Sequence, residues 1–143
     1  MADAIVDSNV IFAFRSAQDQ YHDQAATIVE AMDTGSLPRG VVTNYTLPEI
    51  LNPLSKRAGH DRAVETLTFL EESRGFRIRH LAREDLARGR TVFRRHEGVE
   101  ITDAILVAHM RRTETEFVYS FDDDFDRFDE ITRLTTAENP YEQ

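Results

Sequence analysis

Short apolar runs alternate with amphipathic segments along the chain. Three apolar runs have the length of buried strands and end in polar residues, at residues 4–6, 41–43 and 117–120. Strict alternation at residues 76–79 predicts a half-buried or edge strand, and Leu134 indicates a short last strand. The pattern therefore predicts five short strands.

The segments between these strands have the apolar spacing of helices. Apolar residues at i, i+3, i+4 and i+7 predict a helix over residues 21–33, and a similar stripe predicts another over residues 61–73. A stripe at residues 47–54 predicts a helix that Pro53 bends or shortens. Residues 104–108 are apolar on every side, which predicts a buried helix that Thr102 caps and that starts at Asp103.

An arginine-rich segment precedes this buried helix. Eight arginines lie between Arg74 and Arg95, against two acidic residues. We expect a helix here with Leu86 and Phe93 on one face and much of the arginine cluster on its other face. We interpret the arginines as a solvated helix face, with an RNA-binding surface as the alternative. His109, inside the buried helix, is interpreted as a core residue with satisfied hydrogen bonds.

Strands that alternate with helices predict an α/β fold with a parallel sheet covered on both faces. The 143 residues fit one domain, and 41% hydrophobic residues are enough for a core. No run approaches the length of a membrane span, and the N-terminus has no signal-peptide pattern, so we expect a cytoplasmic protein without a membrane partner.

Four isolated carboxylates lie where a strand ends or a helix starts: Asp7, Glu49, Asp103 and Asp122. Parallel sheets bind ligands at the carboxyl ends of their strands, so this topology gathers the four acids at one edge. Asp124 is a further candidate, while the neighbouring acids are expected to form a solvated surface. Convergence of the four predicts an acidic site.

Each acid also has a local structural explanation. Asp7 can close a turn and cap a helix, Glu49 completes a capping-box pattern with Thr46, Asp103 suits a helix N-terminus, and Asp122 can solvate a loop. For any single residue the structural explanation is favoured. Four independent local roles, however, do not require one common edge, so the joint functional interpretation is preferred.

The chemistry of such a site points to a hard divalent cation. The chain has no cysteine and its five histidines are scattered, which leaves oxygen ligands for any metal. Clustered carboxylates repel one another unless a cation is bound, and Mg²⁺ or Mn²⁺ fits oxygen ligation in a two-metal type of phosphodiester hydrolysis. Asn9 and Ser120 can orient a ligand carboxylate or simply make turn and strand-end hydrogen bonds. The net charge of −9 argues neither for nor against a nucleic-acid partner, because metal binding would offset part of it.

The four acidic segments resemble the successive motifs of PIN-domain ribonucleases, and the small size resembles the VapC-type toxins of toxin–antitoxin pairs. The segments are residues 5–9, 49–51, 102–104 and 119–125. The resemblance implies a three-layer α/β/α sandwich with a central parallel sheet over residues 1–143. It also implies Mg²⁺- or Mn²⁺-dependent cleavage of RNA, a homodimer, and inhibition by a cognate antitoxin.

Residue by residue, the resemblance maps the catalytic acids onto Asp7, Glu49, Asp103 and Asp122. The expected metal ligands are Asp7, Asp103, Asp122 and Asp124, with Asn9 and Ser120 beside them. Ser120 stands where the family more often has Thr, which keeps the hydroxyl.

Three other functions compete with the ribonuclease. An aspartyl-phosphate phosphatase would need a second Asp at position 9, which is Asn9, and a receiver domain would need a strand-end lysine that this chain lacks, since Lys56 is its only lysine. A non-catalytic PIN-like module that binds RNA or protein is the remaining alternative. It leaves the convergence of four acids unexplained.

Overall fold

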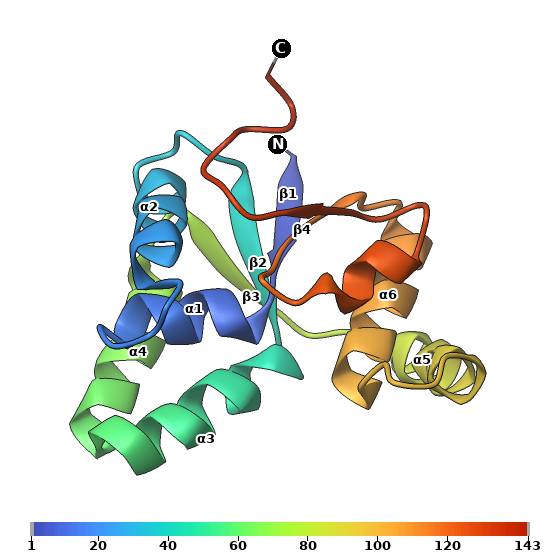
Figure 1. Ribbon diagram of the computed structural model, residues 1–143, viewed down its shortest axis with the longest axis horizontal. Coiled ribbons are helices and arrows are strands. Elements are labelled where there is room, and N and C mark those ends of the chain that lie inside the picture. The colour runs from blue at the N-terminus through green and yellow to red at the C-terminus, as the bar shows by residue number, and fades with distance from the viewer. Residues whose placement is uncertain (1, 143) are drawn as a thin grey trace.

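The computed structural model describes residues 2–142, and within them a five-stranded parallel sheet forms the centre of the fold (Figure 1). The strand order is β3-β2-β1-β4-β5, which places β1 in the middle. The strands are β1 (Asp3–Val6), β2 (Arg39–Thr43), β3 (Phe76–Arg79), β4 (Phe117–Tyr119) and β5 (Thr132–Leu134). The expected parallel sheet is confirmed.

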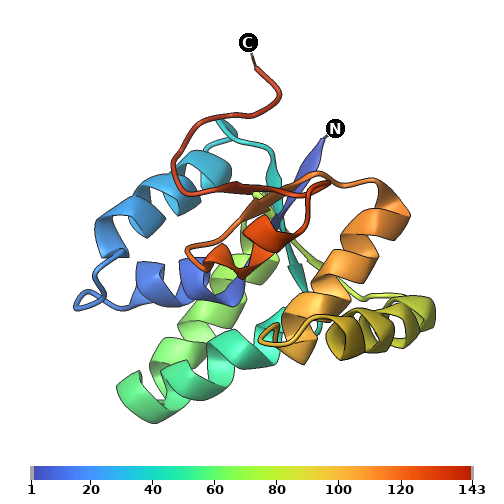
Figure 2. The same cartoon turned by 45° about the vertical axis from the view of Figure 1, so that its right-hand side comes forward.

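Within residues 2–142, six α-helices and one short 3-10 helix connect the strands. They are α1 (Ser8–Arg15), α2 (His22–Asp33), α3 (Thr46–Ala58), α4 (His60–Glu72), α5 (Arg83–Arg95), α6 (Ile101–Thr113) and η1 (Asp123–Arg127). Helices α1 to α4 lie on one side of the sheet, and α5 and α6 lie on the other (Figures 1 and 2). This arrangement is the three-layer α/β/α sandwich that the resemblance implies.

Alternation along β1 divides the core into two parts, because successive strand residues point to opposite faces. Ala4 and Val6 pack with α1, α2 and α3, whereas Ile5 packs with α5 and α6. All three are fully buried. The central strand is therefore held from both faces, which fixes the position of the residue that follows it.

Helix α3 differs from its prediction. It runs past Pro53 to Ala58 and is not shortened there. A proline inside a helix removes one backbone hydrogen bond, and here Ile50 and Leu54 are both buried, so packing holds the helix together. The capping-box alternative for Glu49 is also wrong, because the hydroxyl of Thr46 bonds to Thr43 Oγ1 at 3.0 Å and the helix has no side-chain cap.

The predicted helix forms as α5, but the face that carries Leu86 and Phe93 is not its most buried one. Phe93 is 46% exposed and Leu86 is half-buried, while Asp85, Gly89 and Val92 face inward. Gly89 permits α5 to lie directly against α6, since a Cβ there would lie 2.7 Å from Ile105 Cγ1. The arginines on the outer face are exposed as expected.

Buried Asp85 joins α5 to α6 through a charged network. Its Oδ2 pairs with His109 Nδ1 at 2.9 Å, and its Oδ1 accepts from Arg112 Nε at 2.7 Å. These partners lower the pKa of Asp85 against the effect of burial, and burial lowers the pKa of His109. His109 is thus a core residue with a satisfied ring nitrogen, as predicted from the sequence.

Helix α6 begins earlier than predicted. Glu100 occupies the N-cap position, and Thr102 lies inside the helix, so the prediction of a Thr102 cap is wrong. The apolar segment 104–108 is entirely buried, in agreement with the sequence pattern. Among residues 2–142, no helix combines the length and the apolar character needed to cross a membrane.

Candidate active site

The carboxyl ends of β1 and β4 place two predicted acids side by side. Asp7 directly follows β1, and its backbone N–H donates to the carbonyl oxygen of Tyr119, the last residue of β4, at 3.0 Å. Asp122 lies three residues beyond Tyr119. Parallel pairing of neighbouring strands therefore brings together parts of the chain that are more than 100 residues apart.

Hydrogen bonds fix the carboxylate of Asp7 on both oxygens. Oδ1 accepts from the N–H of Ser8 at 2.8 Å, which makes Asp7 the N-cap of α1. Oδ2 accepts from Ser120 Oγ at 2.7 Å and from Asn9 Nδ2 at 3.3 Å. The two polar residues proposed to orient an acid thus both contact Asp7, and Asn9 Oδ1 also accepts from the N–H of Phe121 at 3.1 Å.

Three carboxylates form the tightest group at this edge. One oxygen each from Asp103, Asp122 and Asp124 lies within 4.8 Å of the others. The local cause is a cap: Asp122 Oδ1 accepts from the N–H of Asp124 at 3.0 Å and starts η1, which turns Asp124 back towards α6. Ser120 Oγ accepts from the N–H of Asp122 at 3.0 Å and so links this group to Asp7.

Glu49 reaches the same region from the first turn of α3. It is half-buried, and burial raises its pKa while the hydroxyl of Thr102 opposes that rise. Repulsion from Asp7 and Glu100 raises the pKa of Glu49 further. Glu49 is not one of the three grouped carboxylates.

Glu100 adds negative charge to the same site, and it was not predicted from the sequence as a site residue. It raises the pKa of Asp7, Glu49 and Asp103 from the N-cap position of α6. Its position three residues before Asp103 was the available signal, because both residues then lie at the start of one helix. Asp126, which also follows β4, has another role, because it pairs with Arg133 at 3.0 Å.

Burial and mutual repulsion raise the pKa values of the clustered acids. Burial raises the pKa of Asp103 to about 8, with repulsion from Asp7, Asp122, Glu100 and Glu49 acting in the same direction. The same two causes raise the pKa of Asp7 to about 6, although its bonds to Ser120 and Ser8 oppose them.

Asp124 is far more open to solvent, and its pKa is raised by its partial burial and by repulsion from Asp122 and Asp123. Within residues 2–142 the three grouped carboxylates form no ion pair, and only the nearby charges of Arg127 and Arg133 offset their repulsion in part.

The donor set fits a hard divalent cation. Carboxylate oxygens are the ligands that Mg²⁺ and Mn²⁺ prefer, and three oxygens within 4.8 Å of one another are close enough to share one ion. A cation would also relieve the repulsion that raises the pKa values of Asp7 and Asp103. The geometry of the site, its negative charge and its oxygen ligands all favour a divalent cation as the occupant.

Comparison with known proteins supports this description. A family model described as PIN domain matches residues 4–131. No relative among curated proteins matches the chain. VapC20 of Mycobacterium tuberculosis, described as a sarcin-ricin loop cleaving toxin, has a similar structure with a TM-score of 0.73 and 26% identity, over 87% of this chain and 93% of that one.

Two toxin–antitoxin complexes share the fold at lower identity. VapBC2 from Rickettsia felis, bound to a DNA fragment from its promoter, matches with a TM-score of 0.70 and 10% identity, over 92% of this chain and 97% of that one. DNA-bound VapBC from Salmonella typhimurium matches with a TM-score of 0.68 and 12% identity, over 94% and 98%.

Proposed function

The chain belongs to the PIN domain family, and from this premise we propose that it is a metal-dependent endoribonuclease and the toxin of a toxin–antitoxin pair. One observation supports the proposal above all others: a carboxylate oxygen from each of Asp103, Asp122 and Asp124 lies within 4.8 Å of the others, next to the fixed carboxylate of Asp7. Residues 1–143 would form a single nuclease domain.

In this proposal Asp7, Asp103, Asp122 and Asp124 hold the metal. A bound Mg²⁺ or Mn²⁺ would stabilise charge on the phosphate oxygens and make water a better nucleophile. Ser120 and Asn9 keep the Asp7 carboxylate in one orientation through bonds of 2.7 Å and 3.3 Å, so it needs no rearrangement to bind.

Glu49 is assigned a different task from the other acids. Its side chain is half-buried, its pKa is raised, and it is not in the group of three close carboxylates. A carboxylate with a raised pKa is a better proton acceptor than an ordinary one. We therefore assign Glu49 to accept the proton of the attacking water when the phosphodiester bond is hydrolysed.

We propose two protein partners, an antitoxin and a second copy of this chain. The similar structures include toxin–antitoxin complexes, and we propose that a cognate antitoxin binds this chain and inhibits it.

We also propose a homodimer. Phe93 near the end of α5 and Ile101 at the start of α6 are 46% and 39% exposed, and the short segment 96–100 joins the two helices. Substituting both by Asp should convert a dimer into a monomer in light-scattering measurements.

Cleavage of RNA by purified protein tests the main proposal. Total RNA is incubated with Mg²⁺, with Mn²⁺ and with EDTA, and wild type is compared with Asp7→Asn, Asp103→Asn and the control Asp129→Asn. Asp129 is exposed, so its substitution makes the same chemical change away from the cluster. We expect cleavage only with metal, and a loss of about a hundredfold or more in the two cluster variants.

Cleavage that persists in EDTA and in both cluster variants would refute the mechanism. Binding of RNA without any cleavage by wild type, at both metals, would favour a non-catalytic PIN-like module instead. The control should retain full activity, which separates loss of ligands from loss of charge.

A further inference from the structure

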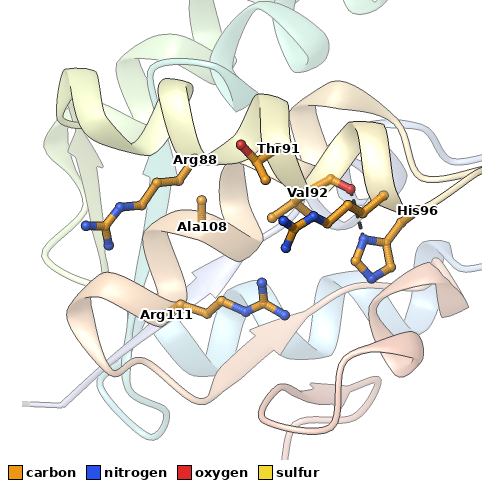
Figure 3. A pocket seen from close by; sticks show the side chains of 7 residues that line it. Arg88, Thr91, Val92, His96, Ala108 and Arg111 are labelled. Carbon is orange, nitrogen blue, oxygen red and sulfur yellow. Dashed lines mark hydrogen bonds between the residues drawn. The ribbon is translucent and has the colours of Figure 1, made fainter.

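A pocket of about 370 Å³ lies between α5 and α6, outside the acidic cluster. Figure 3 shows Arg88, Thr91 and Val92 of α5 on one side of it and Ala108 and Arg111 of α6 on the other. The remaining lining residues are Arg95 and His96. Three guanidinium groups and no carboxylate therefore line one cleft in a protein whose net charge is −9.

The charges of this cleft are mostly unbalanced. Arg111 pairs with Glu130 and lies 5.4 Å from the ring centroid of Phe128, so neighbours fix its position. Arg88 and Arg95 form no ion pair among the residues that the structure describes, and both are exposed. The cleft thus has two positive charges available to an anion beside a third that is already paired.

The floor and the walls have different chemistry. Val92 and Ala108 are buried and form an apolar floor, while His96 Nδ1 is held at 2.9 Å from the carbonyl oxygen of Val92. Thr91 of α5, between Arg88 and Arg95 in the sequence, adds a hydroxyl group to the lining. Guanidinium groups pair with phosphate through two parallel hydrogen bonds, and a hydroxyl adds a further donor. The donor set matches phosphate oxygens, with the floor left for a sugar.

The position of the cleft relates it to the acidic cluster. Asp103 lies in the first turn of α6 and Ala108 five residues later, about 7.5 Å along the helix axis. Arg88 and Arg95 are separated by two turns of α5, about 10.5 Å along its axis. A strand bound in the cleft could therefore contact the protein at more than one phosphate. Ala108 lies about 140° round α6 from Asp103, so the cleft opens on a different face of the helix from the acidic cluster.

We propose that the cleft lined by Arg88, Arg95 and Arg111 binds the phosphate backbone of the RNA strand beyond the catalytic centre, on the α5–α6 side of the sandwich. This inference rests on the proposed ribonuclease function. The acidic cluster and the net charge of −9 repel a polyanion, so productive binding needs a local region of positive charge. For Arg88 and Arg95, the RNA-binding alternative replaces the interpretation as a solvated face, which still describes the outward arginines of α5.

A matched pair of double variants tests the proposal. Arg88→Gln with Arg95→Gln removes two charges from the cleft. Arg90→Gln with Arg94→Gln removes two charges from the same helix, at exposed positions that do not line the cleft. Each double variant also removes one arginine from the last turn of α5, so effects on helix stability are matched.

Fluorescence anisotropy with a labelled single-stranded RNA gives the affinity, and cleavage kinetics give KM and kcat. We expect the cleft variant to lose about tenfold in affinity at 0.15 M salt and to lower the salt dependence of log K by about 1.4, since each phosphate contact on a single strand contributes about 0.7. KM should rise by a similar factor with kcat nearly unchanged. The control variant should stay close to wild type.

Equal effects of the two double variants would overturn the proposal, because they would show only a general loss of positive charge. An unchanged affinity in the cleft variant would also overturn it and leave an acidic protein segment as the occupant to test. If the ribonuclease proposal fails, wild type shows no metal-dependent cleavage. The RNA affinities of the two double variants then still test whether the cleft binds RNA.

Discussion

Replacing Asp103 by Asn should stabilise the metal-free protein, and the gain should depend strongly on pH. Asp103 is 6% exposed, and its side chain forms no hydrogen bond among the described residues, so Asn removes a charge without removing a bond. Burial and repulsion raise the pKa of Asp103 from 3.8 to about 8 in the folded state. A group of this kind binds its proton more tightly when the chain is folded.

The sign and size of the effect follow from this difference in pKa. Stability from a raised acid is fully present below about pH 4 and is lost as pH rises to about 8. At 1.36 kcal/mol per pKa unit, the cost of Asp103 is about 1.5 kcal/mol at pH 5 and about 5 kcal/mol at pH 8. Asp103→Asn should therefore gain about 3.5 kcal/mol more at pH 8 than at pH 5.

Urea unfolding in EDTA at pH 5 and pH 8 measures this difference, with Asp129→Asn as the control. In thermal unfolding, a difference of about 3.5 kcal/mol between the two pH values corresponds to about 10 °C in the Tm gain for a domain of this size. Saturating Mg²⁺ should remove most of the advantage, because a bound cation relieves the same repulsion in wild type. An equal gain at both pH values would refute the argument that ionisation of Asp103 destabilises the empty cluster.

Three further variants test other parts of the structure. Ser120→Ala removes the 2.7 Å bond to Asp7, so cleavage should fall about 10- to 100-fold and the pKa of Asp7, followed by NMR titration, should rise above about 6. Asp85→Ala leaves His109 and its neighbours without their buried carboxylate, which should cost about 3–5 kcal/mol in urea unfolding. Gly89→Ala places a Cβ 2.7 Å from α6 and should cost about 1–3 kcal/mol in the same assay, and a neutral result would show that α5 shifts freely.

The sequence predicts the regular elements well because their apolar periodicity is local. The helix expected at 21–33 is observed at His22–Asp33, and the one expected at 61–73 is observed at His60–Glu72. The edge strand Phe76–Arg79 has the predicted bounds. The gathering of acids at one sheet edge was predicted from parallel topology alone. In the structure Asp103, Asp122 and Asp124 lie close together, and the charges of Asp7 and Glu49 act on Asp103.

Features that depend on long-range partners were not predictable in the same way. The inward face of α5 contains Asp85, which a local pattern assigns to solvent, and only His109 and Arg112 make its burial acceptable. Glu100 belongs to none of the predicted motifs, and it affects the site because its charge raises the pKa of Asp103. The return of Asp124 towards α6 depends on the cap that Asp122 forms.

The acidic cluster draws its members from both helix layers and from the loop beyond β4. Of the proposed metal ligands, Asp7 belongs with the α1–α4 side and Asp103 with α6, while Asp122 and Asp124 follow the end of β4 between them. A cation shared by these carboxylates would act as a cross-link between the two helix layers, beside the hydrogen bond that joins Glu49 of α3 to Thr102 of α6. Its removal would loosen one edge of the sandwich selectively, and hydrogen exchange should quicken at the start of α6 and in η1 while the strands β1 and β2 keep their protection.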